Sequence, residues 1–176
     1  MQKALFSSRN FSLPSNDDMI TEFYSCISDL LQNERVQKLD EHVQHCDTSR
    51  LQHCINVSYY SFRLSYALGW DYKSATRAGL LHDLYFYDWR TNHKKRSYHA
   101  DWHPRVALDN ARKITSLNKV EQDAILKHMW PCTMVPPRYK ESYVVTAVDK
   151  MTAIMEISEK LYNRYIWRRV AVSAKV

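Results

Sequence analysis

The chain of 176 residues contains only two glycines, and this scarcity limits the folds that it can adopt. Turn-rich β-sandwiches and Gly-rich phosphate loops both need glycine where the backbone takes positive φ or approaches a ligand closely. Neither a Walker-type nor a dinucleotide-binding glycine string occurs in the sequence. Strand-like alternation is also missing, and apolar residues recur at helical spacing instead. The sequence therefore predicts an all-α fold, a compact bundle of about six to eight helices.

The chain length and the 45% hydrophobic content suit one domain with its own core. Residues 1–16 are polar and are expected to form a flexible N-terminal arm, and residues 17–176 to form the single domain. Hydrophobic spacing and capping residues place helices near residues 19–31, 36–43, 50–68, 72–82, 103–111, 118–128 and 141–167. The aromatic and basic segment 84–102 has no period, which predicts a long loop of the kind that often serves function.

The charge balance favours anionic partners. Twenty-five Lys and Arg against 19 Asp and Glu give a net charge of +6 and a pI near 9.1. We expect a small phosphorylated substrate, with a nucleotide as one candidate. The basic aromatic stretch 162–169 is compatible with nucleic-acid binding, but an amphipathic helix packed on the domain explains it with fewer assumptions. A homo-oligomer is compatible with the sequence.

Cysteine usage and hydropathy predict a cytoplasmic protein. Cys26, Cys46, Cys54 and Cys132 show no CxxC spacing, and no secretory signal precedes them. Free thiols in a reducing compartment are therefore expected. No apolar run approaches the roughly 18 to 20 residues of a membrane span, so we expect no membrane partner.

The adjacent pair His82-Asp83 ends an apolar helical stretch. A buried ionised carboxylate costs several kcal/mol unless it is paired or binds a cation. Asp149 poses the same problem, because it lies between Val145 and Thr152 in an apolar helical segment. The alternatives are a satisfied histidine with a capping aspartate for the pair, and a nearby Lys or Arg as the partner of Asp149.

Three further histidines come at helical positions that suit metal ligands. His53 lies on a partly apolar face, His103 stands before Pro104 at an expected helix start, and His128 closes a short helix. For His53 the alternative is a core histidine bonded to a carbonyl, for His103 it is an exposed histidine, and His128 is ambiguous on its own. Together with the other three residues they form a set of imidazoles and carboxylates suited to Fe, Mn, Co, Ni or Zn. We expect one or two divalent transition-metal ions, with Asp83 as a bridge where two bind.

The order His53, His82-Asp83 and Asp149 resembles the pattern of the HD-domain metal-dependent phosphohydrolases. The similarity spans about residues 50–155, the expected metal core, and includes the apolar flanks of each motif. His103 and His128 match the positions that complete a second metal site in the binuclear branch of that family. The Gly-Tyr-Pro signature of the cyclic-dinucleotide hydrolases is absent, so the resemblance does not extend to them.

The resemblance implies an HD-domain-like helical bundle and a metal-dependent phosphohydrolase. The expected substrate is a nucleotide or another small phosphorylated metabolite, attacked by a metal-activated water. Some relatives of this fold use the same six ligands for a di-iron centre in an oxygenase, which is one alternative. A binding module that keeps the fold without turnover is the other.

Further residues are expected around the proposed metal site. Asp83 and Lys150 are candidate catalytic residues, although Lys150 is equally explained as part of a solvated helix face. Among the substrate-binding candidates, the alternative for Arg50 is a surface salt bridge, and that for the tryptophan is a place in the core. These candidates are Arg50, Lys94, Lys95, Arg96 and Trp130.

Overall fold

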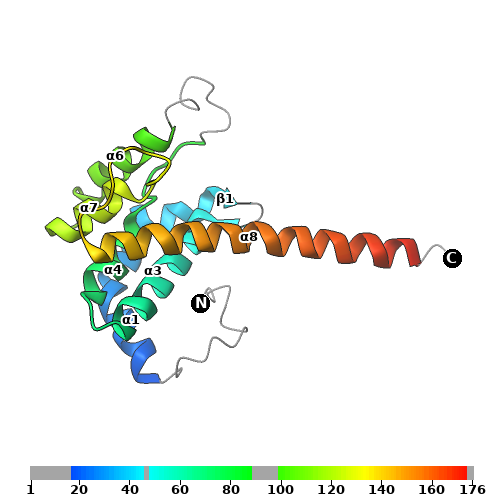
Figure 1. The fold of residues 1–176 in the computed structure, drawn as a ribbon, viewed down its shortest axis with the longest axis horizontal. Coiled ribbons are helices and arrows are strands. Elements are labelled where there is room, and N and C mark those ends of the chain that lie inside the picture. Colours follow the sequence, from blue (N-terminus) through cyan, green and yellow to red (C-terminus); the bar gives the residue numbers. More distant parts are fainter. Residues whose placement is uncertain (1–16, 46–47, 89–98, 174–176) are drawn as a thin grey trace.

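The computed structural model describes residues 17–45, 48–88 and 99–173, and the side chains of the last helix as far as Glu159. The regular elements of this part of the chain are helices apart from one short hairpin, which confirms the all-α prediction (Figure 1). Its elements are α1 (Asp17–Leu31), α2 (Glu34–Gln37), the 3-10 helix η1 (Lys38–Glu41), β1 (Val43–His45), β2 (Thr48–Ser49), α3 (Arg50–Ala67), α4 (Tyr72–Leu81), α6 (His99–Ala111), α7 (Lys119–Lys127) and α8 (Lys140–Ser173).

Side-chain caps begin the helices at the positions that the sequence indicates. Ser49 accepts a hydrogen bond from the backbone N–H of Gln52 at the start of α3. Asp71 caps α4 in the same way, and Asn118 forms a reciprocal capping box with Glu121 at the start of α7. Each cap satisfies backbone donors that the first helical turn leaves without partners, and so sets where the helix starts.

The core forms where α4 packs closely against α3. A Cβ atom at Gly79 would lie 2.8 Å from the Cα of Ser58, so only glycine permits this approach of the two backbones. Leu80 and Leu81 follow and are fully buried, together with Val57 and Phe62 of α3. This packing places the next two residues of the chain, His82 and Asp83, inside the bundle.

Helix α8 packs on α3, α4 and α7 and then extends well beyond the bundle (Figure 1). Its buried side chains include Val145, Val148, Thr152 and Glu156, which recur at helical spacing and mark its inner face. This face brings Asp149 to the same end of the bundle as the residues that follow α4. Among the described helices, none combines the length and the apolar character that a bilayer crossing requires.

The helix predicted near residues 36–43 is wrong. The chain instead forms α2, the 3-10 turn η1 and the strand β1, which pairs antiparallel with β2. Val36 and Leu39 are buried within α2 and η1, but Val43 remains 55% exposed, so continuing the helix to Val43 would bury little further apolar surface. Pairing of the two strands satisfies the backbone instead, and the carbonyl of His42 accepts a hydrogen bond from the N–H of Arg50.

Other expectations differ from the structure in smaller ways. Helix α6 begins at His99, and Pro104 lies inside its second turn, where the ring removes the backbone hydrogen bond that would run to the carbonyl of Ala100. Helix α8 continues past residue 167 to Ser173. Cys26, Cys54 and Cys132 are free thiols, as expected. The predicted N-terminal arm, residues 1–16, lies outside the described residues.

Candidate metal centre

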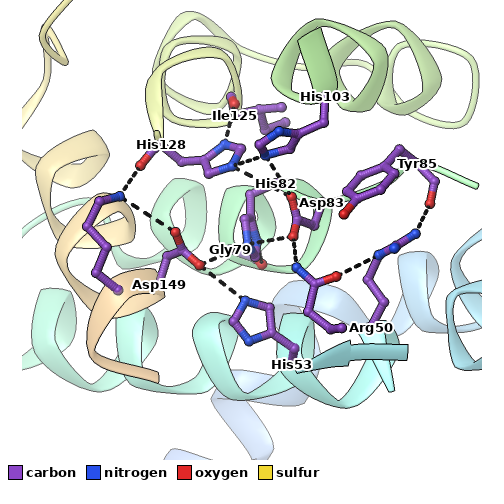
Figure 2. A network of polar contacts seen from close by, with 12 residues as sticks. Arg50, His53, Gly79, His82, Asp83, Tyr85, His103, Ile125, His128 and Asp149 are labelled. Atoms are coloured by element: carbon purple, nitrogen blue, oxygen red, sulfur yellow. Dashed lines mark hydrogen bonds and ion pairs between the residues drawn. The ribbon is translucent and has the colours of Figure 1, made fainter. Parts of the chain in front are cut away.

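The structure brings together all six residues that the sequence indicates as metal ligands (Figure 2). They come from α3, from the ends of α4 and α7, and from α6 and α8, so only the folded bundle assembles them. Four imidazoles and one carboxylate are buried, and the Asp149 side chain is 13% exposed. The set is His53, His82, Asp83, His103, His128 and Asp149.

The two carboxylate oxygens of Asp83 face different histidines. Its Oδ1 lies 3.3 Å from Nε2 of His103 and 3.6 Å from Nε2 of His128. Its Oδ2 lies 3.7 Å from Nε2 of His82. A carboxylate placed in this way can bridge two cations, one on each oxygen.

Asp149 completes the side of the cluster nearest α3. Its Oδ1 lies 3.1 Å from Nε2 of His53 and 3.5 Å from Nε2 of His82. Overlapping sets of three ligand atoms lie within 4.8 Å of one another, which is close enough for each set to bind one ion. Two of the sets share Asp83 and two share His82. The three sets are His53, His82 and Asp83; His82, His128 and Asp149; and Asp83, His103 and His128.

Backbone carbonyls determine which nitrogen of three imidazoles faces the centre. In His82, His103 and His128, Nδ1 lies 2.7–2.8 Å from a carbonyl oxygen one turn earlier in the chain. A carbonyl only accepts, so Nδ1 carries the proton and the neutral ring keeps a lone pair on Nε2. Metal-binding histidines are oriented in this way. The accepting residues are Gly79, His99 and Ile125.

Two of these lone pairs face each other, since Nε2 of His103 and Nε2 of His128 are 2.8 Å apart. Only a cation or a shared proton offsets the repulsion between them. Burial, and then the neighbouring His103 and His82, lower the pKa of His128 to about 3, so His128 does not itself carry such a proton. In addition, Nε2 of His82 and Oδ1 of Asp83 are buried without a hydrogen-bond partner. These atoms fit a metal ion as ligands.

The carboxylates of Asp83 and Asp149 need positive charge close to them. Burial raises the pKa of Asp83, but His82, His103 and His128 together hold it well below its usual range. Asp149 is likewise penalised by burial, and His53 and His82 keep its pKa well below the usual value. Both carboxylates are therefore ionised. The centre needs either protonated histidines or bound cations to balance them.

Glu156 provides a buried carboxylate beside His53, and the sequence did not indicate this residue. Its two oxygens lie 3.1 and 3.2 Å from Nδ1 of His53, on the side of the ring opposite Asp149. Asn56 donates a further hydrogen bond to Glu156. Burial lowers the pKa of His53, but Asp149 and Glu156 together raise it to about 10. The position of Glu156 on the inner face of α8, two turns after Asp149, was the signal that could have identified it.

Lys150 lies at the edge of the centre and links two helices. Its ammonium donates to the carbonyl of His128 at 2.6 Å and lies 3.7 Å from Oδ2 of Asp149. The side chain is 32% exposed, so Lys150 both contacts the centre and borders solvent. This position is compatible with the predicted catalytic role, which stays a prediction.

Of the predicted substrate-binding residues, the structure describes Arg50 and Trp130. Arg50 is 1% exposed, and its guanidinium stacks on the ring of Tyr85 and donates to the Tyr85 carbonyl. Trp130 packs edge-on against Tyr143. The three basic residues 94–96 lie outside the described residues. The burial of Arg50 favours a supporting role over contact with a substrate, and the binding roles of the others stay predictions.

No protein-family model, curated protein or solved structure matches this chain. Membership of a family therefore stays a prediction that rests on the residues and their geometry.

Proposed function

We propose that the protein is a metal-dependent phosphohydrolase of the HD-domain type, acting on a nucleotide or another small phosphorylated metabolite. The observation that carries the proposal is the position of Asp83, whose oxygens face His82 on one side and His103 with His128 on the other. Such a division suits a pair of ions that share one carboxylate, the arrangement used by many phosphoryl-transfer hydrolases.

The residues divide into two ligand sets. One ion would be held by His53, His82, Asp83 and Asp149, and the other by Asp83, His103 and His128. Divalent transition-metal ions at these positions supply Lewis acidity toward a phosphoryl oxygen and lower the pKa of a bound water. Imidazole and carboxylate ligands suit Fe, Mn, Co, Ni and Zn.

The surrounding side chains prepare the site for an anion. Asp149 is the least buried of the six candidate ligands, and Lys150 lies beside it with a side chain that is 32% exposed. An approaching phosphate therefore meets a positive charge at this edge. The buried histidines and Asp83 exclude water on the other side, which strengthens electrostatic interactions within the centre. The net charge of +6 favours the same class of substrate.

The proposal is tested by the metal content and hydrolytic activity of the protein purified without added metal. We expect bound transition metal and hydrolysis of a nucleotide panel or of bis(p-nitrophenyl) phosphate, both lost in Asp83→Ala. Asp109→Ala is the matched control, since Asp109 is exposed on α6 and pairs only weakly with Arg112 at 3.8 Å. Unchanged metal content and turnover in Asp83→Ala would contradict the proposal. Oxygen uptake by the iron-loaded protein, without phosphate release, would favour the oxygenase alternative.

A further inference from the structure

A glutamine of the hairpin, Gln44, contacts the central carboxylate from outside the ligand set. Its side-chain amide donates a hydrogen bond to Oδ2 of Asp83, and its Oε1 accepts a hydrogen bond of 2.7 Å from Nε of Arg50. Arginine only donates, so the carbonyl end of the amide must face Arg50. The NH₂ end is therefore committed to Asp83.

Arg50 is itself held on several sides. Its guanidinium donates to the carbonyl of Tyr85 at 2.6 Å and stacks over the Tyr85 ring at 3.7 Å, and the residue is 1% exposed. Its backbone N–H bonds to the carbonyl of His42 at 2.7 Å, which ties it to the base of the hairpin. A buried guanidinium with these contacts has little freedom, so the orientation that it imposes on Gln44 is rigid.

The hydrogen bond from Gln44 affects the orientation of both oxygens of Asp83. Holding Oδ2 prevents the carboxylate from rotating, and Oδ1 then stays directed at His103 and His128. We propose that Gln44, oriented by Arg50, is a positioning residue that holds Asp83 as a bridge between two metal ions. This inference rests on the proposed metal centre and adds to it a residue that provides no ligand atom.

The experiment compares Gln44→Met with Gln122→Met. Methionine keeps the length of glutamine and removes its hydrogen bonds. Gln122 is the matched control, because its amide also accepts from an arginine, Arg112, and donates to a backbone carbonyl, but on α7 away from the centre. The readouts are calorimetric titration of the metal-free protein with Co²⁺ alone, and the visible absorption of bound Co²⁺.

We expect Gln44→Met to bind Co²⁺ about 10- to 100-fold more weakly, which is the usual loss when a partner of a metal ligand is removed. The Co²⁺ absorption should change as well, because Asp83 then adopts other orientations. Gln122→Met should match the wild type in both readouts. Gln44→Asn, one methylene shorter and unable to span Arg50 and Asp83, should weaken binding in the same direction. Thermal melting of the metal-free variants establishes that each is folded.

Wild-type Co²⁺ affinity and absorption in folded Gln44→Met would overturn the inference while leaving the metal centre intact. Equal losses in Gln44→Met and Gln122→Met would also overturn it, because the effect would then be a general one on stability. Absence of Co²⁺ binding by the wild type is a different result, since it would remove the metal centre itself.

Discussion

Nε2 of His103 and Nε2 of His128 lie 2.8 Å apart, and each ring donates its Nδ1 proton to a backbone carbonyl. Two acceptor nitrogens at this distance favour a cation between them. The two residues come from different helices, α6 and the end of α7, so this proximity is a property of the tertiary structure.

Substitution of His128 tests whether this pair belongs to a second ion. His128→Ala removes one of the three ligands of that set, so we expect bound metal to fall from about two equivalents to about one. Metal analysis of the purified variant measures the result. His42→Ala is the control, since the His42 ring packs against Phe86 outside the ligand set. Two equivalents retained in His128→Ala would show that the pair does not bind metal.

Glu156 should influence metal affinity although it contacts His53 on the side of the ring opposite the proposed metal site. Glu156→Gln removes the carboxylate that orients His53 through Nδ1, and we expect metal affinity to fall about 10- to 100-fold. Competition with a chromogenic chelator measures the change. Glu159→Gln serves as the control, because Glu159 is exposed three residues further along the same helix. An equal loss in both variants would assign the effect to the charge of α8 and not to His53.

Metal removal should destabilise the fold, because bound cations would balance the buried carboxylate of Asp83 and the carboxylate of Asp149, whose side chain is 13% exposed. A ligand at 100 times its Kd stabilises the folded state by about 2.7 kcal/mol. For a chain of this size, that free energy corresponds to a fall in Tm of about 5 to 10 °C on chelation. Calorimetric melting before and after treatment with EDTA measures it, and an unchanged Tm in a metal-containing sample would count against a buried site.

Metal affinity should rise with pH. The pKa of His53 is lowered by burial but raised to about 10 overall by Asp149 and Glu156, so the metal-free ring is protonated at neutral pH. A cation at Nε2 must displace this proton, and the affinity should increase about tenfold per pH unit for each proton released. Titrations between about pH 6 and pH 8 measure the slope. An affinity independent of pH would contradict this protonation state.

The same shift has the opposite consequence for the metal-free fold. A folded-state pKa above the ordinary value near 6.5 means that protonated His53 contributes stability below that value. The contribution is lost as the pH rises through about 10. Urea unfolding of the metal-free protein across this range should therefore show a falling midpoint at high pH, and a smaller fall in Glu156→Gln.

The two glycines should respond to alanine for different reasons. At Gly79 a Cβ would meet the Ser58 backbone at 2.8 Å, and relieving this overlap should cost about 3 kcal/mol. At Gly69 there is open space, and the φ of 64° alone should cost about 1 kcal/mol. Urea unfolding compares the two variants. Gly79→Ala should also weaken metal binding, because the Gly79 carbonyl orients His82. A smaller loss of stability in Gly79→Ala than in Gly69→Ala would contradict this account.

The sequence by itself determined the helical class and the six candidate ligands. Helical spacing of apolar residues, together with caps such as Ser49 and Asp71, is local information, so most helices could be predicted from it. The buried setting of Asp83 and Asp149 was also visible, because ionisable residues within apolar segments need partners.

The tertiary structure alone decided which atoms meet. The division of the Asp83 oxygens, the His103–His128 contact and the support from Glu156 depend on how five segments pack, and contacts between distant segments leave no periodic trace. The hairpin that provides Gln44 was missed for a related reason, since its few polar residues have no local preference strong enough to predict a strand. The side chain of Gln44 contacts Arg50, six residues further along the chain, and Asp83, which comes close only when the bundle is formed.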